Sequence, residues 1–580
     1  MGVPGFFAWL IKNNSKLLNG KLLLEEIKYP IKWLMLDTNC LLHPCMANIL
    51  ERYKNGEIKI NDNNKIREEL EFHIWNKIEE YIDDIIDKVD AENIYIAIDG
   101  VAPIGKILQQ RQRRYKYLFD NTIKLKEEEF NVKCKRSKSG IEEPDIPINS
   151  IELTPGTDYM ERIHNKFKEY VKKLDKKGKK YIYSSYHDPG EGEHKLLQYI
   201  RKNLKNENIV IYGLDADLLF LSLAIERSNN VLIMREKQAF KNENVNIDDE
   251  VIYNYVEIEK LHKMIKNLEI STEDFILICY LVGNDFMPGL LTTDIKKRGL
   301  DKIIQAYKNM LEKNNLNVLN ENNKIQSIII DKDNNYKINH NLLKSLLKEL
   351  IWTEKHIWKN INRDKILNQR ELDGEELERI RYLKQDEKKN NLNKFIKGET
   401  NNTNFLDKIE FKCKEEYYNY YLGINSISID DEIIKVMVTN YIKTIEWCVK
   451  YYFDDCISWS WGYNFLISPI ILDIVKYYPN IVDIDKSECL LNPVEQLILA
   501  IPIDTYKFVI EEDIINKIKG NKNIGYMIPE SYNLDVNKED IYWKCQVKIP
   551  MVEYNEYLSA IKKIKIKNNK NKIEKSLSNI

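Results

Sequence analysis

Between residues 30 and about 290, the chain alternates short apolar runs rich in β-branched residues with longer stretches of helical pattern. Near-continuous apolar runs are typical of strands that helices cover on both faces of a parallel sheet. The predicted strands are residues 32–37, 93–99, 181–186, 208–215 and 230–236. The alternation predicts an α/β fold with a mostly parallel central sheet flanked by helices.

Seven carboxylates lie in five short segments of this region, several of them at the end of a predicted strand. Ligands of open α/β sheets bind beyond the carboxyl ends of the strands, so these side chains are expected to meet at one edge. Hard divalent cations such as Mg²⁺ prefer oxygen ligands, and buried carboxylates need a positive partner. The seven acids are Asp37, Asp99, Glu191, Glu193, Asp215, Asp217 and Asp285.

Each short acidic motif also has a simpler structural interpretation. Asp215 or Asp217 would cap the helix that follows LDAD, and Glu191 or Glu193 would favour a helix dipole in PGEGEHKLL. Caps in five separate segments explain the whole set less well than two divalent ions about 4 Å apart. The predicted chemistry is metal-assisted hydrolysis of a phosphodiester.

A second pattern follows Asp99, in the segment GVAPIGKILQQRQRRYK. Pro103 precedes a predicted helix that starts near residue 104, and four polar side chains recur at i, i+4, i+7 and i+8 on one helical face. A lysine, an amide and two arginines in one stripe beside the acids predict a pocket for a terminal phosphate. The alternative is an ordinary solvated basic face. The four residues are Lys106, Gln110, Arg113 and Arg114.

Aromatic side chains near the acids are candidate platforms for base stacking. His43 lies six residues after Asp37, and Trp459 and Trp461 lie in the loop-like segment SWSWGY. Taken alone, a pair of tryptophans is more typical of core packing.

Composition limits the class of protein. No stretch approaches the roughly 20 apolar residues that cross a bilayer. The apolar N-terminal segment has no basic leader, and the nine cysteines form no CxxC pair, so we expect an intracellular chain that is not secreted. A net charge of −2 means that any polyanionic partner must meet local basic patches.

The chain divides by composition into four predicted parts. Residues 1–355 form a nuclease-like α/β domain, and 356–404 form a charged connector or insertion. Residues 405–556 regain apolar and aromatic density with helical patterns and form a second, mainly helical region, whereas 557–580 form a basic tail.

Several blocks of sequence together resemble the XRN-type 5′→3′ exoribonucleases, in the same order and at similar spacing. In the first half these are MGVPGFF, LDTNCLLHPC, IAIDGVAPIGKILQQRQRR, ELTPGTDYM, HDPGEGEHK, YGLDADLLFL and LVGNDFMPGL. In the second half SWSWGYNF, NPVEQLILAIP and WKCQVKIPMVEY match more loosely, and MVEY departs from the family pattern.

The resemblance implies an α/β nuclease domain related to PIN-like and flap nucleases, with the second region closing over one side of the site. It assigns the seven acids to two Mg²⁺ ions, with Mn²⁺ as the expected substitute, and Lys106, Gln110, Arg113 and Arg114 to a 5′-monophosphate pocket that excludes a cap. It assigns His43 to stacking on the first base, opposite Trp461 in preference to Trp459. The implied partners are 5′-monophosphorylated RNA and decapping factors, for a monomer in the cytoplasm or nucleus.

Two other functions compete with an exoribonuclease that releases mononucleotides. A structure-selective flap or DNA 5′ nuclease would use the same acids without needing the one-face phosphate pocket. A catalytically silent RNA-binding scaffold would keep the fold, although none of the seven acids is replaced.

Overall fold

The computed structural model describes most of the chain, and the statements below concern those residues. They are residues 3, 5–17, 22–134, 146–236, 252–314, 327–332, 335–354, 414–422, 431–489, 491–535, 546–564, 566 and 576–580. The predicted connector, 356–404, lies outside them, as does part of the predicted basic tail. None of the helices in the described part is both long and apolar enough to span a membrane.

An eight-stranded sheet forms the centre of the first half, in the order β1-β7-β6-β5-β2-β3-β4-β12. Its five central strands pair in parallel, which confirms the predicted α/β class. They are β2 (Trp33–Asp37), β3 (Asn93–Ala97), β4 (Lys180–Ser184), β5 (Asn208–Tyr212) and β6 (Asn230–Glu236). Antiparallel strands form the edges: β7 (Tyr253–Glu257) and β1 (Leu23–Leu24) on one side, β12 (Leu577–Ser578) on the other.

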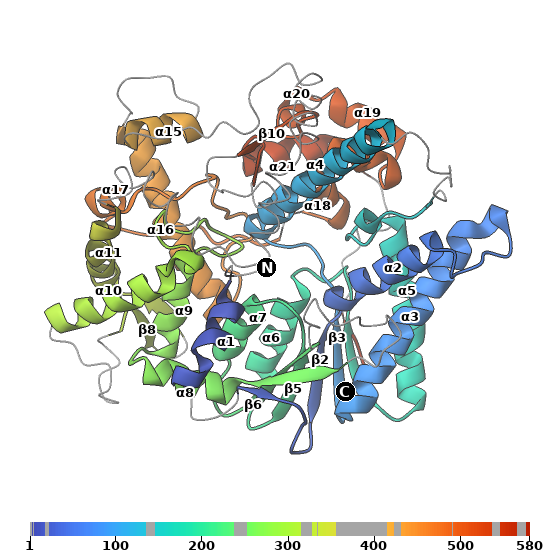
Figure 1. Ribbon diagram of the computed structural model, residues 1–580, viewed down its shortest axis with the longest axis horizontal. Helices are drawn as coiled ribbons and strands as arrows, with labels where there is room; N and C mark the ends of the chain where they lie inside the picture. The colour runs from blue at the N-terminus through green and yellow to red at the C-terminus, as the bar shows by residue number, and fades with distance from the viewer. Residues whose placement is uncertain are drawn as a thin grey trace.

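Helices cover both faces of the sheet because its strands are apolar on both faces (Figure 1). Leu34 and Leu36 of β2 join the core cluster on one face, whereas Trp33 and Met35 join the cluster on the other. The first face carries α2 (Asn39–Lys54), α3 (Ile66–Val89) and α5 (Asp158–Lys176); the second carries α1 (Phe6–Leu17), α6 (Gly192–Asn203), α7 (Asp217–Leu223) and α8 (Ile258–Asn267).

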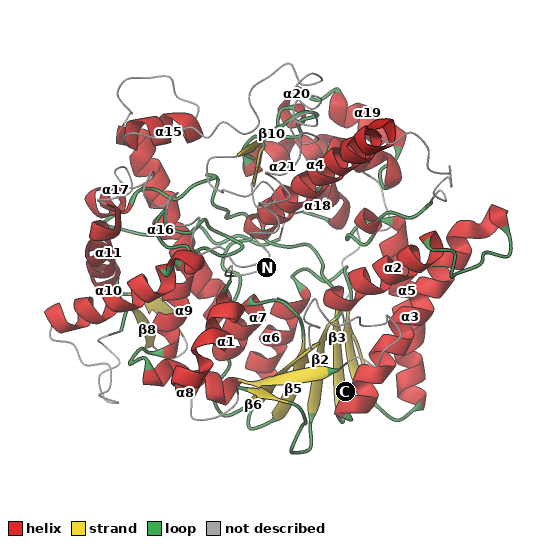
Figure 2. Ribbon diagram, viewed as in Figure 1, coloured by secondary structure: helices red, strands yellow, loops and turns green. Residues whose placement is uncertain are grey.

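The rest of the described chain is mostly helical (Figure 2). One group of helices extends the core cluster that contains α6 and α7: α9 (Thr272–Tyr280), α10 (Gly299–Lys313), α11 (His340–Glu354), α15 (Lys414–Leu422), α16 (Asp431–Phe453) and α17 (Ile471–Lys476). A second group surrounds the start of α4 (Ile104–Cys134): α18 (Pro493–Ala500), α19 (Glu512–Lys519), α20 (Lys522–Gly525) and α21 (Tyr554–Ile564).

Short elements complete the described structure. Two antiparallel pairs are β8 (Ile329–Lys332) with β9 (Asn335–Ile338), and β10 (Asn533–Asp535) with β11 (Gln546–Lys548). The 3₁₀ turns are η1 (Asn63–Lys65), η2 (Ser150–Glu152), η3 (Ile295–Lys297) and η5 (Ile503–Phe508).

Helix α4 joins the two halves of the molecule. It starts beside the sheet, and its buried Arg111 donates to the backbone carbonyls of Pro550, at 2.9 Å, and Met527. Ile104 and Ile107 pack into the apolar cluster formed by α18, α19 and α21. These contacts fix the N-terminal turns of α4 between the sheet and the second group of helices (Figure 1).

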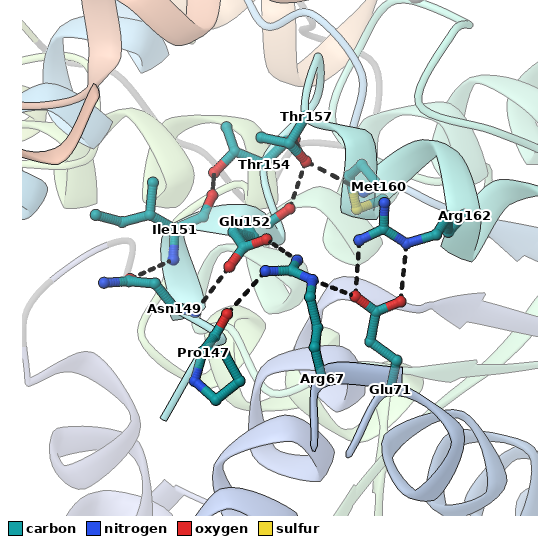
Figure 3. Close-up of polar contacts among 10 residues, drawn as sticks. All are labelled: Arg67, Glu71, Pro147, Asn149, Ile151, Glu152, Thr154, Thr157, Met160 and Arg162. Carbon is teal, nitrogen blue, oxygen red and sulfur yellow. Dashed lines mark hydrogen bonds and ion pairs between the residues drawn. The ribbon is translucent and has the colours of Figure 1, made fainter. Parts of the chain in front are cut away.

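The segment before α5 is anchored by a polar network (Figure 3). Arg67 of α3 donates to the carboxylates of Glu71 and Glu152 and, at 2.7 Å, to the carbonyl of Pro147. Arg162 donates through two nitrogens to Glu71. The following loop brings Gly156 so close to the backbone of Pro493 that an added Cβ would lie 2.7 Å from its carbonyl carbon, which fixes the TPGT turn against α18.

Candidate active site

The sheet and its helices bring the predicted acids to one edge. Asp37 ends β2, and Asp99 follows β3 by two residues. Gly192, the first residue of α6, lies between them: its N–H donates to Asp99 Oδ1 at 2.6 Å, and an added Cβ would lie 2.6 Å from Asp37 Oδ1. The second glycine of PGEGEH is therefore needed for the close approach of two carboxylates.

The other acids enter from neighbouring helix starts and turns. Glu191 precedes α6, Glu193 lies in its first turn, Asp217 begins α7, and Asp285 lies in the turn after α9. Lys106 of α4 connects two of them, because its Nζ lies 2.7 Å from Glu191 Oε1 and 2.9 Å from Asp285 Oδ2. All three side chains are at most 6% exposed.

Burial and mutual repulsion disturb the protonation of this cluster. Burial, and then the nearby charges of Asp99 and Asp215, raise the pKa of Asp37 well above its usual value. Burial also raises the pKa of Glu193 strongly and that of Asp217 to about 8. These raised values mean that the site lacks positive charge when its carboxylates ionise.

Lys106 supplies part of that charge. Burial alone would lower the pKa of Lys106, but the carboxylates of Glu191 and Asp285 raise it well above the usual value. The sequence-based assignment placed this lysine in a phosphate pocket, whereas in the structure its ammonium group bonds to two acids. Its position on the predicted stripe is as expected, and its role in phosphate binding stays a prediction.

The donor set fits a hard divalent cation. Among the described residues, one buried carboxylate oxygen on each of Asp37, Glu193 and Asp217 has no hydrogen-bond partner. Buried oxygens of this kind are costly without a cation or donor, and Mg²⁺ accepts carboxylate ligands. In this structure, however, no three of the described acids bring their ligand oxygens within 4.8 Å of one another, and Lys106 lies among them.

Several supporting residues escaped the sequence-based prediction. The amide of Asn39 donates to Asp99 Oδ2 at 2.8 Å and accepts the Asp99 backbone N–H. Tyr451 of α16 donates to Glu191 Oε2 at 3.0 Å, and buried Lys195 donates to the carbonyls of Ile98 and Ser185, both at 2.8 Å. Asn39 lies two residues after Asp37, so its position in the sequence could have identified it as a site residue. No sequence motif near Tyr451 indicates that it contacts the acids.

The remaining stripe residues of α4 differ in burial. Gln110 is buried, Arg114 is half-buried and Arg113 is exposed. Within the described structure, Gln110 Oε1 and Arg114 Nη1 are buried without a hydrogen-bond partner. Burial and the neighbouring charge of Arg113 lower the pKa of Arg114 to about 9. The Arg114 Nη1 donor is suited to an anionic ligand, whereas the Gln110 Oε1 acceptor needs a hydrogen-bond donor.

His43 of α2 belongs to the same neighbourhood. His43 as a whole residue is exposed. Its imidazole is nevertheless surrounded by protein atoms, and this desolvation, followed by the charges of Arg114 and Arg113, lowers the pKa of His43 to about 4. The imidazole is therefore neutral at neutral pH and available for stacking.

Two family models match nearly the whole chain. The model described as the XRN 5′-3′ exonuclease N-terminus matches residues 1–237, and the model described as the Xrn1 helical domain matches residues 265–404 and 368–576. The chain belongs to the XRN 5′-3′ exonuclease family.

Relatives across the XRN family align over almost all of this chain. It is 24% identical over 673 residues to 5′-3′ exoribonuclease 1 of Schizosaccharomyces pombe, and this alignment covers 97% of this chain and 48% of that protein. It is 25% identical over 623 residues to 5′-3′ exoribonuclease 1 of Homo sapiens, covering 97% of this chain and 34% of the relative. The 5′-3′ exoribonuclease 2 homolog of Drosophila melanogaster is 24% identical over 666 residues, and the alignment covers 97% of this chain and 71% of that protein. The chain spans about half the length, or less, of the first two relatives.

The SWSWG segment of this XRN-family chain runs along the start of α4. Its backbone accepts from Ile104 and Gly105: Ile104 N donates to Trp459 O at 2.9 Å, and Gly105 N donates to Trp461 O at 3.2 Å. Trp459 lies beside apolar residues such as Val101 and Ile107. The Trp461 indole N–H donates to Thr444 Oγ1 at 3.2 Å. Trp461 also packs against the main hydrophobic cluster, so both tryptophans have contacts within the protein, and the preference for Trp461 as the stacking residue stays a prediction.

Proposed function

We propose that this chain is a Mg²⁺-dependent 5′→3′ exoribonuclease that hydrolyses 5′-monophosphorylated single-stranded RNA to mononucleotides. The observation that carries the proposal is the meeting of buried acids from strand ends and helix starts directly beside the basic stripe of α4. The names of the family and of its relatives agree with it.

In this proposal the acids hold divalent cations and the α4 stripe holds the end of the substrate. The metal ligands would be Asp37, Asp99, Glu191, Glu193, Asp215, Asp217 and Asp285. When bound, the cations would supply Lewis-acid activation of water and stabilisation of negative charge, and Mn²⁺ is expected to replace Mg²⁺. Lys106, Gln110, Arg113 and Arg114 would bind the 5′-phosphate. His43 would stack on the first base, with Trp461 in preference to Trp459 on the other side.

The division of labour along the chain is part of the proposal. The first 355 residues would form the nuclease domain and 405–556 the region that closes it, so that RNA enters only from an end. We expect a monomer that acts in the cytoplasm, or in the nucleus, on ends delivered by decapping factors. A size measurement in solution and imaging of a tagged chain would test these expectations.

The state of the RNA end tests the activity. We expect Mg²⁺-dependent degradation of 5′-monophosphate RNA, at least about 10-fold slower degradation of 5′-hydroxyl RNA, and no degradation of capped RNA, since a charge-assisted phosphate contact contributes about 1.5–3 kcal/mol. Mononucleotide release from labelled RNA gives the rates, with 5′-phosphorylated single-stranded DNA in parallel and chelator as the blank. Equal rates on all four substrates would favour the flap or DNA nuclease, and no turnover on any would favour the silent scaffold.

Arg114 tests the phosphate pocket. Arg114→Ala is expected to lower kcat/KM for 5′-monophosphate RNA by about 10-fold or more and to change that for 5′-hydroxyl RNA little, because the lost contact exists only with the phosphate. Single-turnover and steady-state rates on the two RNAs measure this difference. Arg298→Ala is the control, since Arg298 is an exposed arginine paired with Asp301. An equal loss on both RNAs would assign Arg114 to general RNA binding.

A further inference from the structure

A second cluster of ligating side chains involves the segment between β4 and α6 that leads to Glu191. Glu161 and His164 lie three residues apart on α5, so both face the same side of that helix. His187 comes from the loop between β4 and α6. The ligand atoms of these three residues all lie within 4.8 Å of one another.

We propose that Glu161, His164 and His187 form a binding site for a first-row transition-metal ion, Zn²⁺ in particular. This site is separate from the seven acids and does not depend on the proposed nuclease activity.

Neighbouring hydroxyls contact two of the three side chains, and the third, His187, contacts Glu161. Tyr183 OH lies 2.9 Å from His164 Nδ1, and Tyr186 OH donates to Glu161 Oε2. His187 Nε2 lies 3.0 Å from the same Glu161 oxygen. Hydroxyl and carboxylate partners that fix the rings and carboxylates of ligands are a usual feature of metal sites, because they limit the movement needed on binding.

The donor chemistry suits zinc better than magnesium. Two imidazoles and one carboxylate are a ligand set of zinc sites, with a fourth position left for water, whereas Mg²⁺ prefers oxygen ligands alone. Bonds of about 2.1 Å in a tetrahedron separate neighbouring ligand atoms by roughly 3.4 Å. The observed spread of 4.8 Å or less requires only small side-chain movements.

Burial and charge also favour a bound cation. His164 and His187 are 2% and 3% exposed, while Glu161 is half-buried and leaves a route for an ion. Partial burial would raise the pKa of Glu161, but the Tyr186 hydrogen bond and the neighbouring histidines lower it, so the carboxylate is ionised. An ionised carboxylate beside two buried imidazoles is attractive to a divalent cation.

The site would connect α5 to the loop that leads to the active-site acids. Four residues after His187 the chain reaches Glu191, and the loop between is held by hydrogen bonds from Gly190 N to Val101 O, at 2.7 Å, and from Gly100 N to Gly190 O, at 2.8 Å. A metal ion at His187 would add a third attachment at the other end of this loop.

Without a metal, the same residues would serve only as a hydrogen-bonded network, since Glu161 already accepts from Tyr186 and His187. Zinc binding distinguishes the two roles. The full-length chain is dialysed against Zn²⁺ in excess Mg²⁺, which occupies the acids, and bound zinc is counted by mass spectrometry. We expect one equivalent at micromolar affinity or tighter, and a rise in Tm of at least about 2 °C.

Three variants and one control decide the assignment. His164→Gln, His187→Gln and Glu161→Gln are each expected to weaken zinc binding at least about 100-fold and to remove the rise in Tm. Glu161→Gln keeps a hydrogen-bond acceptor for Tyr186 and so serves if either histidine variant fails to fold. His262→Gln is the matched control, because His262 is a buried histidine bonded to the Thr272 hydroxyl at 3.0 Å.

Cobalt provides an independent readout, since Co²⁺ bound by imidazoles in a tetrahedral site absorbs visible light strongly. We expect this absorption in the wild-type chain and in His262→Gln, and its loss in Glu161→Gln. Zinc that persists unchanged in the folded Glu161→Gln variant, or a wild-type chain that binds none at micromolar concentrations, would overturn the proposal.

Discussion

Replacing Asp217 with asparagine is expected to reduce RNA hydrolysis by at least about 10²–10³-fold, the scale found when one charge-stabilising group leaves an active site. Asp217 is 2% exposed at the start of α7, and one of its oxygens is buried without a hydrogen-bond partner in the described structure. Asparagine keeps the size of the side chain and removes the negative charge that a divalent cation needs. Mononucleotide release under saturating Mg²⁺ measures the loss.

The control for this substitution is Asp513→Asn, because Asp513 lies on the exposed surface of α19 beside Lys517. It is expected to keep full activity. Binding of 5′-monophosphate RNA to Asp217→Asn should persist, since the substitution leaves the α4 stripe intact. A variant that retains turnover within a few-fold of the wild-type rate would remove Asp217 from the metal-binding set.

The backbone of the site follows from sequence alone, for a physical reason. The apolar runs at 32–37 and 208–215 are predicted to be buried between two helical layers, and they contain the parallel strands Trp33–Asp37 and Asn208–Tyr212, the second of which ends three residues earlier than predicted. In a parallel sheet the residues after each run must emerge at the same edge, so the convergence of Asp37 and Asp99 around Gly192 was predictable. The pairing of charged groups within the site was not predictable in this way.

Lys106 shows where periodicity stops being informative. Helical spacing places it on the same face as Gln110, and the structure agrees that both are buried. Helical spacing does not predict which group the flexible ammonium of Lys106 will bind. In the structure it pairs with the nearby carboxylates of Glu191 and Asp285. The same limit applies to Tyr451, whose bond to Glu191 joins residues that are 260 positions apart.

The group formed by Glu161, His164 and His187 was not identified from the sequence, for another reason. The two histidines belong to different elements, and no ligand spacing connects them along the chain. Only the packing of α5 against β4 brings His164 and His187 together, with ring centroids 5.1 Å apart. Side-chain clusters that depend on packing of this kind require coordinates to be found.

The metal-free protein is expected to lose stability as the pH rises from about 4 to 8. The pKa of Asp217 is raised to about 8 in the folded chain, from an ordinary value of 3.8, so the folded state binds more protons than the unfolded state in this window. The protonated carboxyl contributes fully below the unfolded pKa, and its contribution is lost as the pH passes the folded value. Each unit of raised pKa corresponds to about 1.4 kcal/mol, which amounts to several kcal/mol for Asp217 alone.

Asp217→Asn isolates that contribution, because asparagine stays neutral at every pH. In chelator, the gain in unfolding free energy of the variant over wild type is expected to be about 2–3 kcal/mol larger at pH 8 than at pH 6, as two units of titration require. Urea unfolding followed by circular dichroism gives the comparison, and Asp513→Asn should show no such difference. Mg²⁺ should stabilise the wild type more at pH 8 than at pH 6, since metal binding displaces the bound protons. If Asp217→Asn instead stabilises the metal-free chain equally at both pH values, Asp217 is already ionised at pH 6, and positive charge such as that of Lys106 then compensates the crowded carboxylates.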